Sequence, residues 1–260
     1  MEATKRTLKE AVEAQFSAAA AAYATSGVHA GGPDLEAMLV AAHPDGTQRL
    51  LDVGSGAGHT SIFFAPHVAE VHALDLSEPM LDQGRRLASE RGLTNLEWHC
   101  GEAEALPFPD AHFDLVTSRQ SAHHYEDLER ALAEIVRVLR AGGRLVVVDS
   151  VAPEDHAGDT FLNTFEILRD ASHVRDHRVS DWCRMLEAAG LHAEAGGRWW
   201  LDMDFEDWVR RSATPPDAVE ALRAFVRRAP HDVRAPFFPD PEGCSRVKLE
   251  AGLVVGTRTT

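Results

Sequence analysis

A glycine-rich turn follows a short apolar run in the first quarter of the chain. Gly54, Gly56 and Gly58 alternate with other residues, and Asp52 lies two positions before the first of them. Glycine allows an approach that a Cβ would block, so a cofactor could lie directly against main-chain amides here. Asp75 ends the next apolar run, 21 residues after Gly54, where an acid accepts hydrogen bonds from ribose hydroxyls.

Two classes of cofactor compete for this turn. A dinucleotide site has the spacing GxGxxG, with the pyrophosphate at a helix N-terminus. This chain has GxGxG instead, and Asp52 would repel a pyrophosphate but suit a ligand with an ammonium group. Asp75 fits the ribose of either class. A turn with only a structural role would not need three glycines together with both acids, so the pattern favours cofactor binding.

Further motifs extend this pattern and carry a resemblance to a known family. Residues 101–108 read GEAEALPF, residues 113–116 read FDLV, and residues 134–143 read EIVRVLRAGG. Together with the glycine turn, residues 49–149 resemble the class I S-adenosylmethionine-dependent methyltransferases, whose corresponding segments read GDAExLPF and ExxRVLKPGG. The details are similar to the ubiquinone/menaquinone-biosynthesis type and to related bacterial small-molecule methyltransferases. The His123-His124 step and residues 169–175 extend the similarity beyond the core.

The resemblance implies a cofactor, S-adenosylmethionine, and a set of residues that bind it. In the family, the segment after the third strand frames the adenine, and here Glu102 replaces the usual Asp with a longer side chain. An aromatic residue before the core, here Tyr23, touches the methionine end of the cofactor. The cofactor-binding residues implied are Tyr23, Asp52, Gly54, Ser55, Gly56, Gly58, Asp75, Leu76, Met80, Glu102, Ala103, Glu104, Ser118 and Arg119.

His123 and His124 are the candidate catalytic residues because they follow the fourth predicted strand, near the expected position of the methyl group. The sulfonium is already an activated donor, so the protein contributes mainly positioning and exclusion of water. A base is needed only if the acceptor must lose a proton, and histidine titrates in the useful range. Alternatively, one ring orients the substrate or the next helix. His123, His124 and His173 do not have the spacing that is typical of metal ligands, so no metal site is expected.

A dense polar group beyond the core supplies candidate substrate-binding residues: Arg169, Asp170, His173 and Arg175. On a helix, Arg169 and His173 would share one face and could hold an acidic or polar substrate over the cofactor. Ion pairs that only close this part of the fold are an equally weighted alternative.

Hydrophobic patterning predicts the elements that position these residues. Continuously apolar runs alternate with amphipathic segments, which is typical of a parallel sheet covered on both faces. The prediction is a Rossmann-like, doubly wound α/β fold with a mainly parallel seven-stranded sheet, an N-terminal helical segment and an inserted helical lid. We expect a helical cap at 1–45, the cofactor-binding core at 46–150, and a substrate-side insert with the last strands at 151–260. Predicted strands are 49–53, 71–75, 96–100, 113–117, 144–149, 192–194, 197–203 and 252–257, and predicted helices include 3–24, 35–42, 60–68, 80–91, 128–139, 159–171, 180–189, 204–212 and 217–229.

Composition narrows the function classes. The net charge of −15 argues against nucleic acid or an anionic membrane surface as a partner, and no apolar run is long enough to span a bilayer. Three scattered cysteines and the lack of an apolar N-terminal leader predict a cytoplasmic protein. We therefore expect methyl transfer to a small-molecule carbon, oxygen or nitrogen nucleophile. An S-adenosylmethionine-binding sensor or scaffold, and less favourably an NAD-dependent oxidoreductase, remain as alternatives. The sequence leaves the oligomeric state open, a homodimer included.

Overall fold

A twisted sheet forms the centre of the computed structural model, which describes residues 7–24, 31–240 and 244–259. The strand order is β3-β2-β1-β4-β5-β8-β7, and the two-residue β6 pairs beside β5. The first five strands are parallel and β8 runs antiparallel between β5 and β7, so the predicted mainly parallel sheet is confirmed. Seven strands form its continuous order and β6 adds an eighth to the side, where seven were predicted. The strands are β1 (Arg49–Val53), β2 (Glu70–Asp75), β3 (Leu96–Cys100), β4 (Phe113–Arg119), β5 (Leu139–Ala152), β6 (His177–Arg178), β7 (Leu191–Asp204) and β8 (Arg246–Arg258).

Helices cover both faces of this sheet, as the continuously apolar strands require. One face packs against α3 (Pro33–Ala42) and α4 (His59–Phe64), which continues into the short η1 (Ala65–His67). The other face packs against α6 (Leu128–Val138) and α8 (Val179–Ala188). The helix α5 (Glu78–Glu90) lies beside β2 and β3, and Ser77 caps its N-terminus, accepting a hydrogen bond from the Met80 amide.

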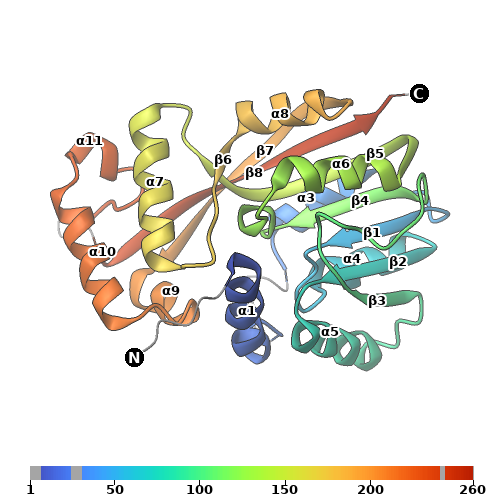
Figure 1. The fold of residues 1–260 in the computed structure, drawn as a ribbon, viewed down its shortest axis with the longest axis horizontal. Helices are drawn as coiled ribbons and strands as arrows, with labels where there is room; N and C mark the ends of the chain where they lie inside the picture. Colours follow the sequence, from blue (N-terminus) through green and yellow to red (C-terminus); the bar gives the residue numbers. More distant parts are fainter. Residues whose placement is uncertain (1–6, 25–30, 241–243, 260) are drawn as a thin grey trace.

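A second apolar core forms where β7 and β8 continue past the rest of the sheet. Four helices gather around that extension, at the left of Figure 1. Buried aromatic and aliphatic side chains, including Phe161, Phe165, Phe205 and Leu222, join them to Val247 on β8. The helices are α7 (His156–Arg169), α9 (Phe205–Arg211), α10 (Pro216–Arg228) and α11 (His231–Arg234). The N-terminal helix α1 (Leu8–Ala24) lies between these outer helices and α5 in Figure 1.

The structure differs from the predicted elements in three places. The strand predicted at 144–149 begins at Leu139, because α6 ends at Val138 and the chain continues directly as β5 through Gly142, where the pairing with β4 shifts register. The helix predicted at 180–189 begins at Val179, and the Ser180 hydroxyl donates to Glu154. The strands predicted at 192–194 and 197–203 form one strand, β7, with an irregularity between Ala195 and Arg198.

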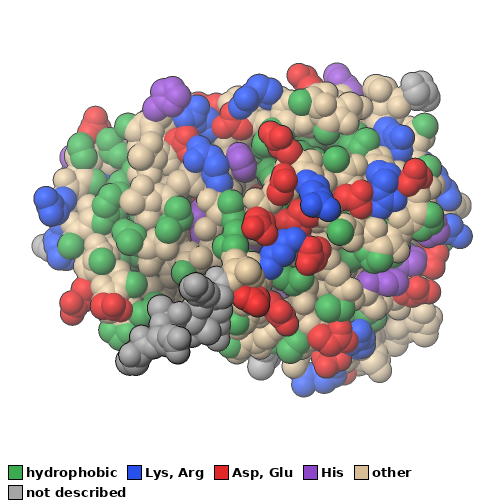
Figure 2. Space-filling model, viewed as in Figure 1, with side chains coloured by type: hydrophobic (Ala, Val, Ile, Leu, Met, Phe, Trp, Pro, Cys, Tyr) green, Lys and Arg blue, Asp and Glu red, His purple; other side chains and the backbone are tan. Residues whose placement is uncertain are grey.

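The surface is mixed in character on the face drawn in Figure 2. Acidic and basic side chains are interspersed over its right half, and hydrophobic side chains are more frequent over the outer helices at the left. Within the ranges described, no helix combines the length and the apolar character that crossing a membrane would take.

Candidate active site

A cavity of about 650 Å³ opens at the carboxyl ends of β1, β2 and β4. This is the edge of an open α/β sheet at which ligands bind. The cavity extends from the glycine turn to the outer helices, so both parts of the molecule contribute to its wall. Of the residues predicted to bind cofactor or substrate or to act in catalysis, it is lined by Gly54, Ser55, Gly56, Asp75, Leu76, Met80, Glu102, Ala103, Glu104, Arg119, His123, His124, Arg169 and Asp170.

The three glycines of the turn have different structural roles. Gly54, Gly56 and Gly58 all have a positive φ, a conformation that side chains other than glycine rarely adopt. A Cβ on Gly54 would lie 2.5 Å from the Ser121 hydroxyl, and one on Gly58 would overlap the Trp98 ring. At Gly56 the same position is open space at the cavity wall. Gly56 is therefore the glycine whose missing side chain leaves room for a ligand.

The two acids near the turn are not equivalent. Asp52 is buried and accepts hydrogen bonds from Ser61 Oγ at 2.6 Å and Thr117 Oγ1 at 2.9 Å, and burial raises its pKa to about 6. Asp52 does not line the cavity. Its two hydrogen bonds instead join β1 to β4 and to α4. Asp75 does line the cavity, and its carboxylate accepts from the Gly56 amide at 2.7 Å, which fixes the turn.

The segment after β3 is tied to the N-terminal helix by charge. Lys9 Nζ on α1 lies 2.5 Å from Glu102 Oε2 and 3.5 Å from Glu104 Oε2. Glu104 also accepts hydrogen bonds from the backbone amides of Glu126 and Asp127. Glu102 and Glu104 are therefore held at the wall by contacts within the protein, and both lie near the Lys9 ammonium.

The helix α1 closes the cavity from one side. The Phe16 ring meets the His124 ring edge-on, with centroids 4.9 Å apart, and Ser17 Oγ lies 2.9 Å from Ser77 Oγ. Gln15 reaches the backbone of Ser212 beside α9, so α1 touches both the core and the outer helices. Val12 and Phe16 line the cavity, whereas the side chain of Tyr23 lies outside the part that the structure describes.

His123 forms a close pair with the carboxylate of Asp149 at the cavity wall. It lies in η2 (Ala122–His124), its Nδ1 is 2.5 Å from Asp149 Oδ1, and its backbone amide donates to Asp149 Oδ2. Burial alone would lower the pKa of His123, but the attraction and hydrogen bond of Asp149 outweigh it and raise the pKa to about 9. Because Nδ1 faces Asp149, Nε2 is the ring nitrogen that remains for an acceptor.

The other two histidines of the region are held neutral. Burial, and then the charge of His123, lower the pKa of His124 to about 3 and that of His173 to about 2. His124 Nδ1 donates to the Ser172 carbonyl at 3.0 Å, and His173 Nε2 lies 3.3 Å from Asn163 Oδ1. His173 is behind the wall of the cavity, so of these three histidines His123 and His124 line it.

Two buried carboxylates line the cavity without full hydrogen bonding. Asp176 is 1% exposed, and neither of its carboxylate oxygens has a partner among the residues described. Burial raises its pKa to about 8. Glu166 binds Arg169 through Oε2, but its Oε1 is also buried and unsatisfied within the described residues. Such groups cost stability when they are left unpaired, so they point to a ligand that bonds them.

The predicted substrate-binding group is divided between the cavity and the surface. Arg169 and Asp170 line the cavity, and the Arg169 guanidinium lies over the Trp208 ring at 4.8 Å. Arg175 instead pairs with both carboxylate oxygens of Asp159 at 2.8 Å, outside the cavity. Gly58, Ser118 and Asp52 likewise lie behind the wall, where they pack or bond other protein groups.

Several cavity residues were not anticipated from the sequence. Asp149 does not line the cavity itself but holds His123 there. It ends a predicted strand, at the edge where ligands bind, and that position was the available signal. Phe16 and Val12 share a helix face at i, i+4 spacing, which predicted packing but not a ligand. Nothing local marks Glu166 or Asp176, because the fold of the outer helices brings them to the cavity.

S-adenosylmethionine fits the residues at this end of the cavity. Gly56 leaves space at the wall, and the buried Ser55 hydroxyl beside it has no partner within the described parts of the chain. Asp75 stands at the end of β2, where an acid meets ribose hydroxyls. Glu102 and Glu104 follow β3 on the same wall, with Leu76 and Met80 as apolar neighbours.

Comparison with known proteins agrees with this fit. Residues 51–147 match the family described as a methyltransferase domain. The uncharacterized methyltransferase YcgJ of Bacillus subtilis is 38% identical over 225 residues, covering 86% of this chain and 89% of its own. Its crystal structure has a TM-score of 0.83 at 35% identity and covers 87% of this chain and 98% of the other. A ubiquinone/menaquinone biosynthesis C-methyltransferase of Dinoroseobacter shibae is 42% identical over 117 residues, 44% of this chain and 47% of its own.

The relationship to YcgJ spans most of both chains, and the motifs that it includes line or support one cavity. The dinucleotide alternative is therefore set aside, because the acid before the turn and the segment after β3 belong to the same matched domain. The chain belongs to the class I S-adenosylmethionine-dependent methyltransferases, and S-adenosylmethionine is its cofactor.

Proposed function

We propose that this enzyme methylates a small molecule that binds between the glycine turn and the outer helices and loses its proton to His123. The observation that carries the proposal is the contact of His123, which lines the same cavity as Gly56 and Asp75, with the carboxylate of Asp149. When bound, S-adenosylmethionine supplies an activated methyl group on its sulfonium. Transfer of that methyl group to the acceptor would release S-adenosylhomocysteine, and His123 Nε2 would take up the proton that the acceptor loses.

Asp149 gives His123 the character of a base. It accepts from Nδ1, fixes the tautomer and stabilises the imidazolium that forms when Nε2 takes a proton. The Asp149 carboxylate also accepts from the backbone amide of His123, so it holds this residue through both the ring and the main chain. A base orientated in this way suits an acceptor whose hydroxyl, amine or acidic carbon must be deprotonated during transfer.

The far end of the cavity suits an acceptor with hydrogen-bond donors and an apolar part. Asp176 and Glu166 offer unsatisfied carboxylate oxygens, and Met203 and Trp208 supply apolar wall. A ligand N–H or O–H would satisfy the buried oxygens and recover their desolvation cost. The closed position of α1, with Phe16 against His124, would exclude water during the reaction.

Labelled methyl transfer tests this proposal. The protein is incubated with S-adenosylmethionine labelled in its methyl group and, separately, with a low-mass metabolite extract, a protein fraction and a nucleic-acid fraction. We expect label only in the low-mass fraction, in a product heavier by one methylene. Label in protein or nucleic acid would overturn the small-molecule assignment.

Two variants separate transfer from binding. His123→Gln should bind S-adenosylhomocysteine as the wild type does, because Asp75 and Gly56 are unchanged, but should lose about 10²–10⁴-fold in transfer. His192→Gln, on the exposed part of β7, is the matched control and should keep full activity. Full binding with no transfer to any fraction, even in the wild type, would favour the sensor or scaffold alternative.

A further inference from the structure

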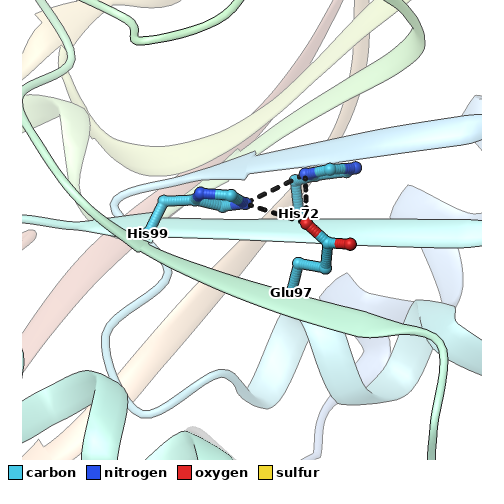
Figure 3. A group of neighbouring side chains, drawn as sticks. All are labelled: His72, Glu97 and His99. Atoms are coloured by element: carbon cyan, nitrogen blue, oxygen red, sulfur yellow. Dashed lines mark hydrogen bonds and ion pairs between the residues drawn. The ribbon is translucent and has the colours of Figure 1, made fainter.

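Three side chains on the edge of the sheet turn toward one another, away from the cavity. His72 lies on β2, and Glu97 and His99 lie two positions apart on the neighbouring edge strand β3. The strands are parallel and His72 is paired with Glu97, so all three side chains leave the same face of the sheet. Figure 3 shows their polar ends converging.

The distances among the three polar atoms match the size of a metal ion. His72 Nδ1 lies 3.0 Å from His99 Nε2, and Glu97 Oε2 lies 3.8 Å from each of these nitrogens. A point equidistant from the three atoms is about 2.1 Å from each of them. Zinc binds imidazole nitrogen at roughly 2.0–2.1 Å and carboxylate oxygen at roughly 2.0–2.2 Å.

A second carboxylate stands behind His72. His72 Nε2 is buried without a directed hydrogen bond, and it lies 3.1 Å from Glu70 Oε1. A metal-binding histidine commonly presents its other nitrogen to a carboxylate, which fixes the tautomer and strengthens the ligand. With Glu70 near Nε2, the proton of a neutral His72 is favoured on that atom, and the lone pair on Nδ1 faces His99 and Glu97.

The surroundings allow entry from solvent but hold the rings in place. The His72 side chain is 8% exposed, that of His99 28% and that of Glu97 59%. The Phe108 ring meets both imidazoles edge-on, with centroids 5.6 and 5.0 Å away. The two imidazole rings are nearly parallel, with an interplanar angle of 16° and centroids 5.1 Å apart.

We propose that His72, Glu97 and His99 form a binding site for a divalent cation of the zinc class, with solvent as the fourth ligand. The site is separate from the cavity, because none of the three residues lines it. Bound metal would fix β3 to β2 next to Gly101, where the segment with Glu102 and Glu104 begins. The proposal does not depend on the identity of the methyl acceptor.

Zinc titration of protein freed from metal by a chelator tests the site. We expect one zinc ion per chain in calorimetry and a rise in Tm with zinc concentration, since a ligand that binds the folded state stabilises it. Cobalt(II) in place of zinc should give the strong visible absorption of a low-coordinate site. No saturable zinc binding would mean that the histidines only share a hydrogen bond, and would overturn the proposal.

Variants locate the ion. His99→Gln and Glu97→Gln should each weaken zinc binding at least tenfold and remove the cobalt spectrum. His112→Gln is the matched control, because its ring lies 6.0 Å from the His72 ring but is not a ligand. Unchanged S-adenosylhomocysteine binding would show that His99→Gln is folded. If His99→Gln binds zinc as tightly as the wild type, the ion is held elsewhere and the assignment is wrong.

Discussion

His123 concentrates the chemistry of the site in one ring, and its pH behaviour follows from Asp149. The carboxylate raises the pKa of His123 to about 9, so the ring is mostly an imidazolium at pH 7. If the neutral ring is the base, kcat/KM should rise roughly tenfold per pH unit from pH 7 and level off near pH 9. Initial methyl-transfer rates measured as a function of pH give this rise, which is the ascending limb of the pH profile.

Asp149→Asn is the informative partner of that measurement. It removes the charge that raises the pKa of His123, so the limb should move to lower pH, toward the ordinary histidine value of about 6.5. The plateau should also fall, because a weaker base remains. A profile that is flat from pH 7 to 9 in the wild type would show that His123 orients the acceptor without accepting its proton.

Asp176 is the residue at which stability and function are expected to conflict. Burial raises its pKa to about 8, so between pH 4 and 8 the unfolded chain releases a proton that the folded chain retains. Stability contributed at this site therefore falls as pH rises through that range. Asp176→Asn removes the ionisation and should stabilise the protein, by about 1–3 kcal/mol at pH 8 and less at pH 5.

Thermal unfolding between pH 5 and 8 checks this expectation. The gap in Tm between Asp176→Asn and the wild type should widen with pH, while the KM for the acceptor increases. Glu220→Gln, an exposed neutral substitution on α10, is the control for removing one negative charge. A constant gap in Tm across this range would mean that Asp176 ionises normally in the folded protein.

Among the elements, most strands were predictable, but one half of β8 was not. The strands 49–53 and 96–100 have the predicted bounds. The first is buried and reads as a bounded apolar run, whereas the second is the partly exposed edge strand β3. The outer half of β8, residues 246–251, was not predicted, since Lys248 and Glu250 interrupt the apolar pattern there. Asp75 was correctly placed at a strand end, but its contact with the Gly56 amide depends on the turn geometry.

In the turn after β1, experiment can distinguish a glycine that packing requires, Gly58, from a glycine that leaves room for the cofactor, Gly56. A Cβ at Gly58 would overlap Trp98, which also packs against Gly84 on α5. A Cβ at Gly56 meets only cavity. We expect Gly58→Ala to cost roughly 1–3 kcal/mol of stability through overpacking and φ strain. Gly56→Ala should lose less stability but weaken S-adenosylhomocysteine binding at least tenfold.

Gly92→Ala isolates the backbone strain in this comparison. Gly92 has a φ of +67°, a Cβ there would meet nothing within 4 Å, and it lies far from the cavity in the chain after α5. Denaturant unfolding and calorimetry with S-adenosylhomocysteine give both quantities for each variant. Equal loss of cofactor affinity in Gly56→Ala and Gly92→Ala would contradict a specific role of Gly56.

At the scale of the whole molecule, the site is assembled from distant segments by one pair of long strands. The strands β7 and β8 pair from Leu191↔Arg258 to Asp204↔Arg246. Val254 belongs to the core under α6 and α8, whereas Val247 belongs to the core of the outer helices. This placement of Glu166 and Asp176 opposite the glycine turn is tertiary, so local sequence patterns could not predict it.

The shared strands also predict cooperative unfolding of the two cores. Leu222 is fully buried in the core of the outer helices, and Leu222→Ala should lower the free energy of unfolding by about 2–5 kcal/mol. Because the strands it packs over also form the inner core, we expect one thermal transition at a lower Tm, with coincident far-ultraviolet circular dichroism and tryptophan fluorescence curves. Leu132→Ala, in the inner core, should behave alike. A separate early transition in Leu222→Ala alone would show that the outer helices unfold independently, and that β7 and β8 do not couple the two walls of the cavity.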